Sequence, residues 1–175
     1  MSDTTGFLPF AFDTYGTDKG GAVVGKVYED HNTGYKYIFC QAHTVLTNDT
    51  TAIGEIAVQQ SATAKGVATN RATGSLDATY PIALGVITSV CPESTATTTY
   101  YFWALKEGYV ATLLNDGTDQ TAGFNLYPVA ADPCSCKGIA GTTTSDNGVI
   151  QSIFGRAATT VTGTNSTAFV KFKDI

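Results

Sequence analysis

The chain has 175 residues, a formal net charge of −5 and a sequence pI of about 4.8. Only 10 residues are lysine or arginine, and no basic patch stands out, so the sequence argues against direct nucleic-acid binding. The apolar runs are far shorter than the ~20 residues that span a bilayer, and the first residues lack the basic region and apolar stretch of a signal peptide. We therefore expect a protein made in a cytosol, with no membrane partner.

Few charges and many small hydroxyl and turn residues characterise the composition. Charged residues make up 14% of the chain, against a usual ~25%, while 43% of residues are hydrophobic. The 29 threonines favour strands, and the 18 glycines supply turns. A chain of this size is expected to form one domain that buries roughly 70% of its unfolded surface. Because few charges would be desolvated, its surface is suited to close packing against another surface.

The first twenty residues differ from the rest. Three aromatic side chains, Phe7, Phe10 and Phe12, surround Pro9, and turn residues follow them. We predict an extended N-terminal arm over residues 1–20. The arm has two alternative roles. Its aromatic side chains grip a neighbouring subunit or another surface, or it forms a first strand packed into its own domain.

Short strands separated by turns are predicted through the first half of the remaining chain. A hairpin is expected because alternating apolar residues flank a cluster of turn residues at 29–34. Residues 61–79 are small and polar, which predicts a long loop or excursion. The predicted strands cover residues 22–28, 35–42, 53–58 and 81–90, with a weak strand at 64–69.

The centre of the chain holds its most aromatic segment. Residues 100–105 are followed by Gly108 and by a second apolar stretch at 109–114, and this pattern predicts a hairpin that turns at the glycine. Asn115-Asp116-Gly117-Thr118 predicts a further turn. Beyond it, strands are predicted at residues 124–129, 148–158 and 166–172, and a loop at 131–138.

These segments together predict an all-β fold, a small antiparallel β-barrel or sandwich over residues 21–175. The extended arm at 1–20 precedes this β-rich domain, and the excursion at 61–79 interrupts it. No stretch of about ten residues or more has the apolar spacing of an amphipathic helix.

The sequence offers little support for catalysis. His31 lies among turn residues and His43 follows a strand, and neither belongs to a recognisable nucleophile–base signature. A zinc site is a further hypothesis, with ligands from Cys40, His43 and a later cysteine pair. That pair, Cys134 and Cys136, has one intervening residue instead of the usual two to four. The alternative to a zinc site is that two of the cysteine thiols are buried and that the others are exposed in a loop. We therefore expect that the protein is not an enzyme and that it binds no metal or cofactor.

Aromatic side chains on a threonine-rich sheet also raise the hypothesis of sugar binding. The candidates are Trp103, Tyr101 and Tyr109. Aromatic residues dominate protein cores because of their large area, so the preferred interpretation is that they hold the sheet to its neighbour. We predict that Trp103 and Tyr109 belong to the core.

Five segments carry a recognisable pattern of strands and glycines. They are Gly-Val-Ile-x-Ser-Val at 85–90, Tyr-Tyr-Phe-Trp-x-Leu-x-x-Gly-Tyr-Val at 100–110, Asn-Asp-Gly-Thr at 115–118, and Ile153–Ala157 followed by Ala168–Phe172. The pattern, over residues 22–58 and 81–172, resembles the capsid decoration, or cement, proteins of tailed bacteriophages. The Phe7–Phe12 segment and the Cys134–Cys136 loop are not typical of that group.

The resemblance implies a non-enzymatic virion structural protein. Such a protein would bind the outer face of an icosahedral head as a homotrimer and bridge neighbouring major capsid proteins, after assembly in the host cytoplasm. The group shares no active-site residues, so none is transferred. The residues expected to contact the partner are Phe7, Phe10 and Phe12. The alternative is a receptor- or glycan-binding module of a phage fibre or spike.

Overall fold

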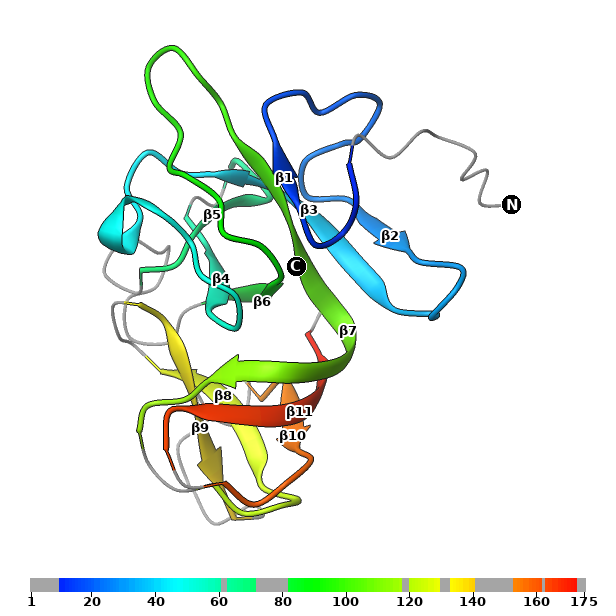
Figure 1. Cartoon of the computed structure of the whole chain (residues 1–175), viewed down its shortest axis with the longest axis vertical. Helices are drawn as coiled ribbons and strands as arrows, with labels where there is room; N and C mark the ends of the chain where they lie inside the picture. The colour runs from blue at the N-terminus through cyan, green and yellow to red at the C-terminus, as the bar shows by residue number, and fades with distance from the viewer. Residues whose placement is uncertain are drawn as a thin grey trace.

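The computed structural model of the chain describes residues 10–60, 63–71, 82–117, 120–129, 133–140, 153–161 and 163–172. This part of the chain is nearly all β, as predicted, and its eleven strands belong to one continuous sheet (Figure 1). The strands are β1 (Tyr15–Gly16), β2 (Val27–Glu29), β3 (Lys36–Ala42), β4 (Ile56–Gln59), β5 (Val67–Thr69), β6 (Ala83–Ile87), β7 (Tyr101–Leu114), β8 (Asn125–Val129), β9 (Ser135–Ile139), β10 (Gly155–Ala157) and β11 (Asn165–Lys171). A short 3-10 turn, η1 (Thr47–Asp49), lies between β3 and β4.

Five strands close into a barrel. β3 pairs with β5, β5 with β4, β4 with β6, β6 with β7, and β7 returns to β3. The β3–β5 pairing is parallel, and the other pairings in this ring are antiparallel. β2 extends β3 from outside, which confirms the predicted hairpin, and β1 pairs with the start of β7. Closure removes the exposed edges at which other chains would pair.

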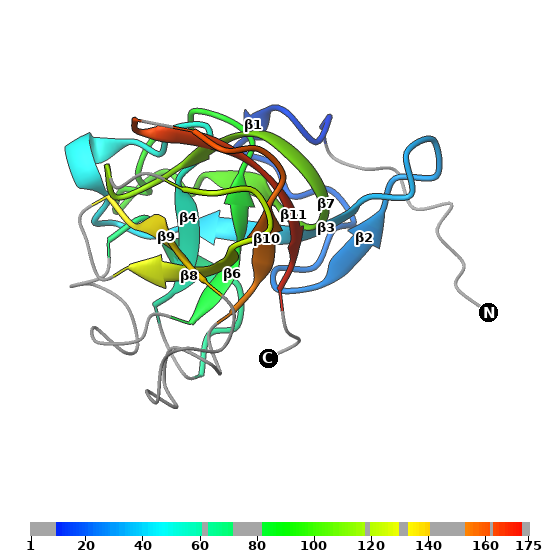
Figure 2. The same cartoon turned by 90° about the horizontal axis from the view of Figure 1, so that it is seen from below.

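β7 is a single bent strand, and the prediction of a hairpin at Gly108 is wrong. Its first half lies in the barrel between β3 and β6, and its second half pairs with β11 (Figures 1 and 2). Gly108 has a φ of +151°, and an added Cβ would lie 2.8 Å from Cγ of Tyr35. The glycine therefore bends the strand without reversing it, because partner strands continue on both sides of the bend.

The second half of β7 begins a curled sheet in the order β7-β11-β10-β8-β9. A backbone bridge between Asn115 and Cys136 brings β9 back beside the end of β7. The loop predicted over 131–138 is therefore wrong for its second half, because Ser135–Ile139 is β9 and pairs with β8 along its length. The local residues favour a loop, but cross-strand pairing overrides that preference.

Three hydrophobic clusters hold these layers together. Small side chains, including Ala42, Ala57 and Ala104, help to fill the barrel interior. Larger apolar residues from the curled sheet form a second cluster that reaches β4 and β6. The third cluster lies on the outer side of β3 and β7, where Phe39 and Trp103 pack together with their ring centroids 4.6 Å apart.

A buried polar network ties the loop before β4 to the residue that follows β5. Asn70 Nδ2 donates to Glu55 Oε2 at 2.8 Å, and Asn70 Oδ1 accepts from the Thr47 backbone N–H at 2.8 Å. The Ala52 backbone N–H donates to the same Glu55 oxygen at 2.7 Å. Burial raises the pKa of Glu55, and the hydrogen bonds from Asn70 and Ala52 oppose that effect. The network compensates for taking a carboxylate out of water.

The remaining predicted strands can be placed in the described residues. The segments at 124–129 and 166–172 correspond to β8 and β11, and the end of 148–158 contains β10. The turn at Asn115–Gly117 is confirmed, because Gly117 N–H donates to Asn115 Oδ1 at 2.8 Å. The predicted excursion lies partly outside the described residues, and within it Val67–Thr69 forms β5. No helix in the described ranges is long and apolar enough to cross a bilayer.

Candidate interaction surface

The described part of the N-terminal arm packs against its own barrel. Phe10 and Phe12 are half-buried, and their ring centroids lie 6.1 and 5.0 Å from that of Trp103. Trp103 Nε1 donates to the Phe10 carbonyl at 3.3 Å, and Thr88 Oγ1 donates to the Phe12 carbonyl at 2.5 Å. These contacts match the alternative of a first strand packed into its own domain. Phe7 lies outside the described residues.

Trp103 and Tyr109, which were both predicted in the core, have different surroundings. Trp103 is 0% exposed, which confirms its prediction and leaves no ring face for a sugar. Tyr109 is 38% exposed, so its assignment to the core is wrong. The physical reason is that Tyr109 follows the bend at Gly108, beyond the part of β7 that the arm covers. Its ring contacts Phe169 of β11, with centroids 5.2 Å apart.

Flat side chains form a row across the outer face of the curled sheet. Tyr109 on β7 is paired with Phe169 on β11, and Phe169 is paired in turn with Arg156 on β10. Arg156 is paired with Asn125 on β8, and its Nε donates to Asn125 Oδ1 at 3.3 Å. Phe169 is 63% exposed. We call these four residues the aromatic row, after its two aromatic members, Tyr109 and Phe169.

A hollow of about 360 Å³ adjoins the aromatic row. Its lining includes apolar surface from Phe169, two cationic side chains, Arg156 and Lys171, and the backbone of Gly155. An added Cβ on Gly155 would lie 2.5 Å from the Phe169 carbonyl oxygen, so β10 and β11 are in close contact here. The combination suits a partner that presents an apolar group beside an anionic or hydroxyl-rich group.

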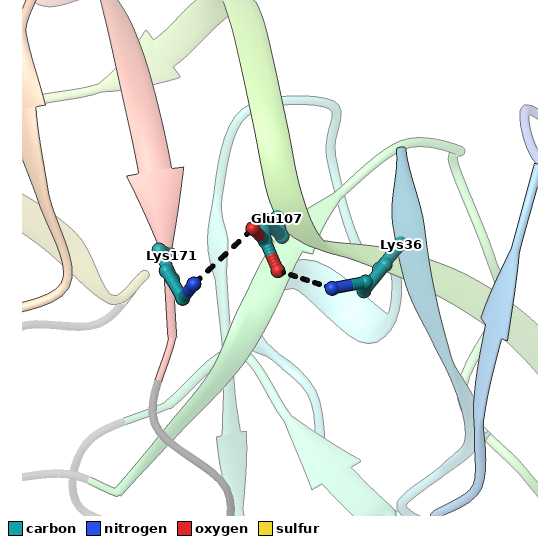
Figure 3. A network of polar contacts seen from close by, with 3 residues as sticks. All are labelled: Lys36, Glu107 and Lys171. Atoms are coloured by element: carbon teal, nitrogen blue, oxygen red, sulfur yellow. Dashed lines mark hydrogen bonds and ion pairs between the residues drawn. The ribbon is translucent and has the colours of Figure 1, made fainter. Parts of the chain in front are cut away.

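Glu107 lies between Lys36 and Lys171 (Figure 3), and Lys171 is also one of the residues that line the hollow. Lys36 Nζ of β3 donates to Glu107 Oε2 at 2.8 Å, and Lys171 Nζ lies 3.3 Å from Glu107 Oε1. The hydrogen bond from Lys36 is the largest influence on Glu107 and lowers its pKa; burial opposes it, and Lys171 lowers the pKa further. Because all three side chains reach solvent, we expect the network to orient Lys171 more than to stabilise the fold.

The four hypothetical zinc ligands do not converge. Cys40 belongs to the cluster inside the barrel, whereas Cys134 and Cys136 belong to the core of the curled sheet. His43 Nδ1 accepts a hydrogen bond from the Val45 backbone N–H at 3.2 Å. The alternative of an exposed thiol loop is also wrong, because Cys134 and Cys136 are both buried in the core of the curled sheet.

Burial makes three of the cysteines, Cys40, Cys91 and Cys136, poor nucleophiles, because it raises the pKa of each thiol. All four cysteines are free and buried. Burial raises the pKa of Cys91 to about 12, and burial likewise raises that of Cys136 to about 12 against a hydrogen bond from Gln120. Thiol chemistry requires the thiolate, so these side chains act as small apolar groups.

No protein-family model matches the chain, and no curated protein shows significant sequence similarity to it. The assignment of this site therefore depends only on the geometry of its residues. Sequence reasoning missed Phe169, Arg156 and Asn125 as site residues. The alternation along β11, in which Ala168 and Val170 are buried and Phe169 is exposed, is a signal that could have suggested an outward aromatic residue.

Proposed function

We propose that the protein is a non-enzymatic capsid decoration protein. It binds the outer face of an icosahedral head and bridges neighbouring major capsid proteins, which stabilises the shell. The observation that carries this proposal is the aromatic row, because it places a 63% exposed phenylalanine on a sheet face and not in the core. Large apolar side chains exposed next to polar groups are typical of protein interaction sites.

The closed barrel supports a mechanical role for this face. β7 belongs to both the barrel and the curled sheet, so the aromatic row is attached to a continuous hydrogen-bonded framework. A homotrimer would present three copies of the row at once. Individually weak contacts would then add through high effective concentration, as is needed to hold adjacent capsid proteins together.

The test is co-sedimentation of the purified protein with empty shells of its virus. Phe169→Ser together with Tyr109→Ser removes the apolar part of the row, and we expect occupancy to fall by about tenfold or more. Ile53→Ser is the matched control, because Ile53 is also a large exposed apolar residue, at 56%. Unchanged occupancy of the double variant, with an intact thermal transition, would remove the basis of the proposal.

The N-terminal arm offers a second test of attachment. Phe10 and Phe12 cover Trp103, so removing residues 1–20 would also uncover the barrel. Removing residues 1–9 takes away Phe7 and leaves that packing in place. If the arm grips the capsid, this truncation lowers shell occupancy without changing the melting temperature, and equal occupancy would restrict attachment to the sheet face.

A glycan-binding module is the second candidate, favoured by the combination of aromatic rings with Arg156 and Asn125. Planar polar groups bind paired hydroxyl or carboxylate oxygens, and an exposed ring offers a stacking surface. A glycan array distinguishes the two functions. Binding that disappears in Phe169→Ala, with shell occupancy at background in the wild type, would favour the glycan.

A further inference from the structure

β2 is an edge strand of the sheet. The five-stranded ring is closed, but β2 extends it from outside and stands at one end of the strand order, at the outer side of the molecule (Figure 1). Within the described residues, the strand paired with β2 is β3. An edge strand presents unpaired backbone N–H and C=O groups, so a strand of another chain can pair with it.

The outward-facing backbone groups of β2 belong to Val27 and Glu29. The Lys26 carbonyl accepts a hydrogen bond from β3 at 3.0 Å, and the Asp30 backbone N–H donates one to the residue before β3 at 2.8 Å. Residues of an antiparallel pair bond to the same partner at every second position, so the N–H and C=O groups of Val27 and Glu29 point away from β3. A strand from outside can therefore form two hydrogen bonds with each of these two residues.

The side chains along β2 are complementary to a second copy of the same strand. Lys26 and Asp30 lie two residues on either side of Tyr28, and the two-residue period of a strand places all three on one face. In an antiparallel pair centred on Tyr28, Lys26 of each copy lies opposite Asp30 of the other, and opposite charges at such positions stabilise a sheet. The Asn32 backbone N–H and the Thr33 hydroxyl lower the pKa of Asp30, so its carboxylate is charged at neutral pH.

The backbone selects the same register. Centring the pair on Tyr28 places Val27 opposite Glu29 twice, which allows four backbone hydrogen bonds. Centring it on Glu29 would set two like charges opposite each other, which destabilises a sheet pair. Centring it on Val27 would require Gly25, whose N–H already donates to the Phe39 carbonyl at 2.7 Å. Backbone and side chains therefore agree on one arrangement, which has twofold symmetry.

We propose that two copies of the protein pair through β2, antiparallel and centred on Tyr28, so that one sheet continues from the first copy into the second. Because β2 has only three residues, the dimer is weak, with a dissociation constant on the order of 0.1–1 mM. The pairing is independent of the proposed capsid function, since β2 and the aromatic row involve different residues. On a shell that holds copies close together, the same pairing would link neighbouring copies, and this consequence alone rests on the proposed function.

The experiment is analytical ultracentrifugation of the full chain in the absence of shells, combined with amide hydrogen exchange. From about 10 μM to about 2 mM protein, we expect the average mass to rise towards twice its value at low concentration. Over the same range, exchange should slow at the amides of Val27 and Glu29 and stay unchanged at that of Tyr28, which faces β3. A constant mass, or a rising mass without slower exchange at Val27 and Glu29, would overturn the proposal.

Two charge reversals test the register. Lys26→Glu makes both positions acidic and Asp30→Lys makes both basic, so each variant alone should dimerise at least about fivefold more weakly than the wild type. An equimolar mixture of the two variants should recover wild-type affinity, because opposite charges again face each other across the pair. Lys19→Glu is the matched control, because Lys19 is exposed and lies outside β2, and it should leave dimerisation unchanged.

A mixture that dimerises no better than the separate variants, or an equal loss in the Lys19→Glu control, would also refute the pairing. Asp30 accepts hydrogen bonds from Asn32 and Thr33 in the turn after β2, so Asp30→Lys can disturb that turn. The mass and exchange measurements on the wild type need no variant, and they decide the matter even if this one fails to fold.

Discussion

Replacing Gly155 by alanine tests how closely β10 packs against β11 beneath the aromatic row. The added Cβ would lie 2.5 Å from the Phe169 carbonyl oxygen and 3.1 Å from the Val170 Cα. Both are backbone atoms of β11, which is also paired with β7, so neither can move aside easily. Overpacking of this kind costs about 1–3 kcal/mol. For a chain of this length, the midpoint of thermal unfolding should fall by roughly 2–12 °C.

Gly21→Ala is the matched control, because nothing lies within 4 Å of an added Cβ there. Its φ is not among the positive values, so alanine should be neutral or should stabilise the fold by about 0.4–1 kcal/mol. Scanning calorimetry and urea unfolding would measure both variants. If Gly155→Ala melts at or above the wild-type temperature, or if both variants lose the same stability, the reasoning about this strand contact is refuted.

Three further predictions concern the interior. The raised pKa of Glu55 means that its contribution to stability is complete below its ordinary value of 4.5 and is lost as pH rises through the folded value. Glu55→Gln should therefore flatten the decline in unfolding free energy above pH 4.5, and an unchanged decline in urea titrations would contradict this. Phe12→Ala should destabilise the fold by about 2 kcal/mol and shift Trp103 fluorescence to the red, because it uncovers the indole ring; an unshifted spectrum would mean that the arm does not cover it. Cys91 and Cys136, with pKa values of about 12, should resist iodoacetamide at pH 8 until the protein unfolds, whereas rapid labelling of the native protein would show that they are accessible.

Local chemistry was enough to predict much of the strand content. The β2–β3 hairpin follows from alternating apolar residues around a cluster of turn residues, and β11 shows the same two-residue period. The Asn115–Gly117 turn depends on a side-chain acceptor two residues before the glycine, which is a short-range interaction. Each of these features is decided by neighbours in the sequence, so pattern reasoning can find them.

Strand continuity could not be predicted in the same way. An apolar stretch after Gly108 is compatible both with a hairpin that turns at the glycine and with one strand that bends there. Only the pairing of β7 with β3 before the glycine and with β11 after it shows that the strand bends. β9 is a strand because β8 pairs with it, although Pro133 and Gly138 favour a loop. Register between distant strands depends on the whole sheet and not on local propensity.

The candidate site residues also separate into features that the sequence predicts and features that only the tertiary structure shows. By itself, the sequence determined the abundance of strands and turns, the low charge and the presence of aromatic residues suited to a packed surface. Only the tertiary structure decided that Phe12 covers Trp103, that Tyr109 and Phe169 remain exposed, and that β2 is an edge strand. Burial depends on contacts between segments that are far apart in the chain. The type of a residue therefore indicates how much free energy its burial would contribute, but not which neighbour covers it.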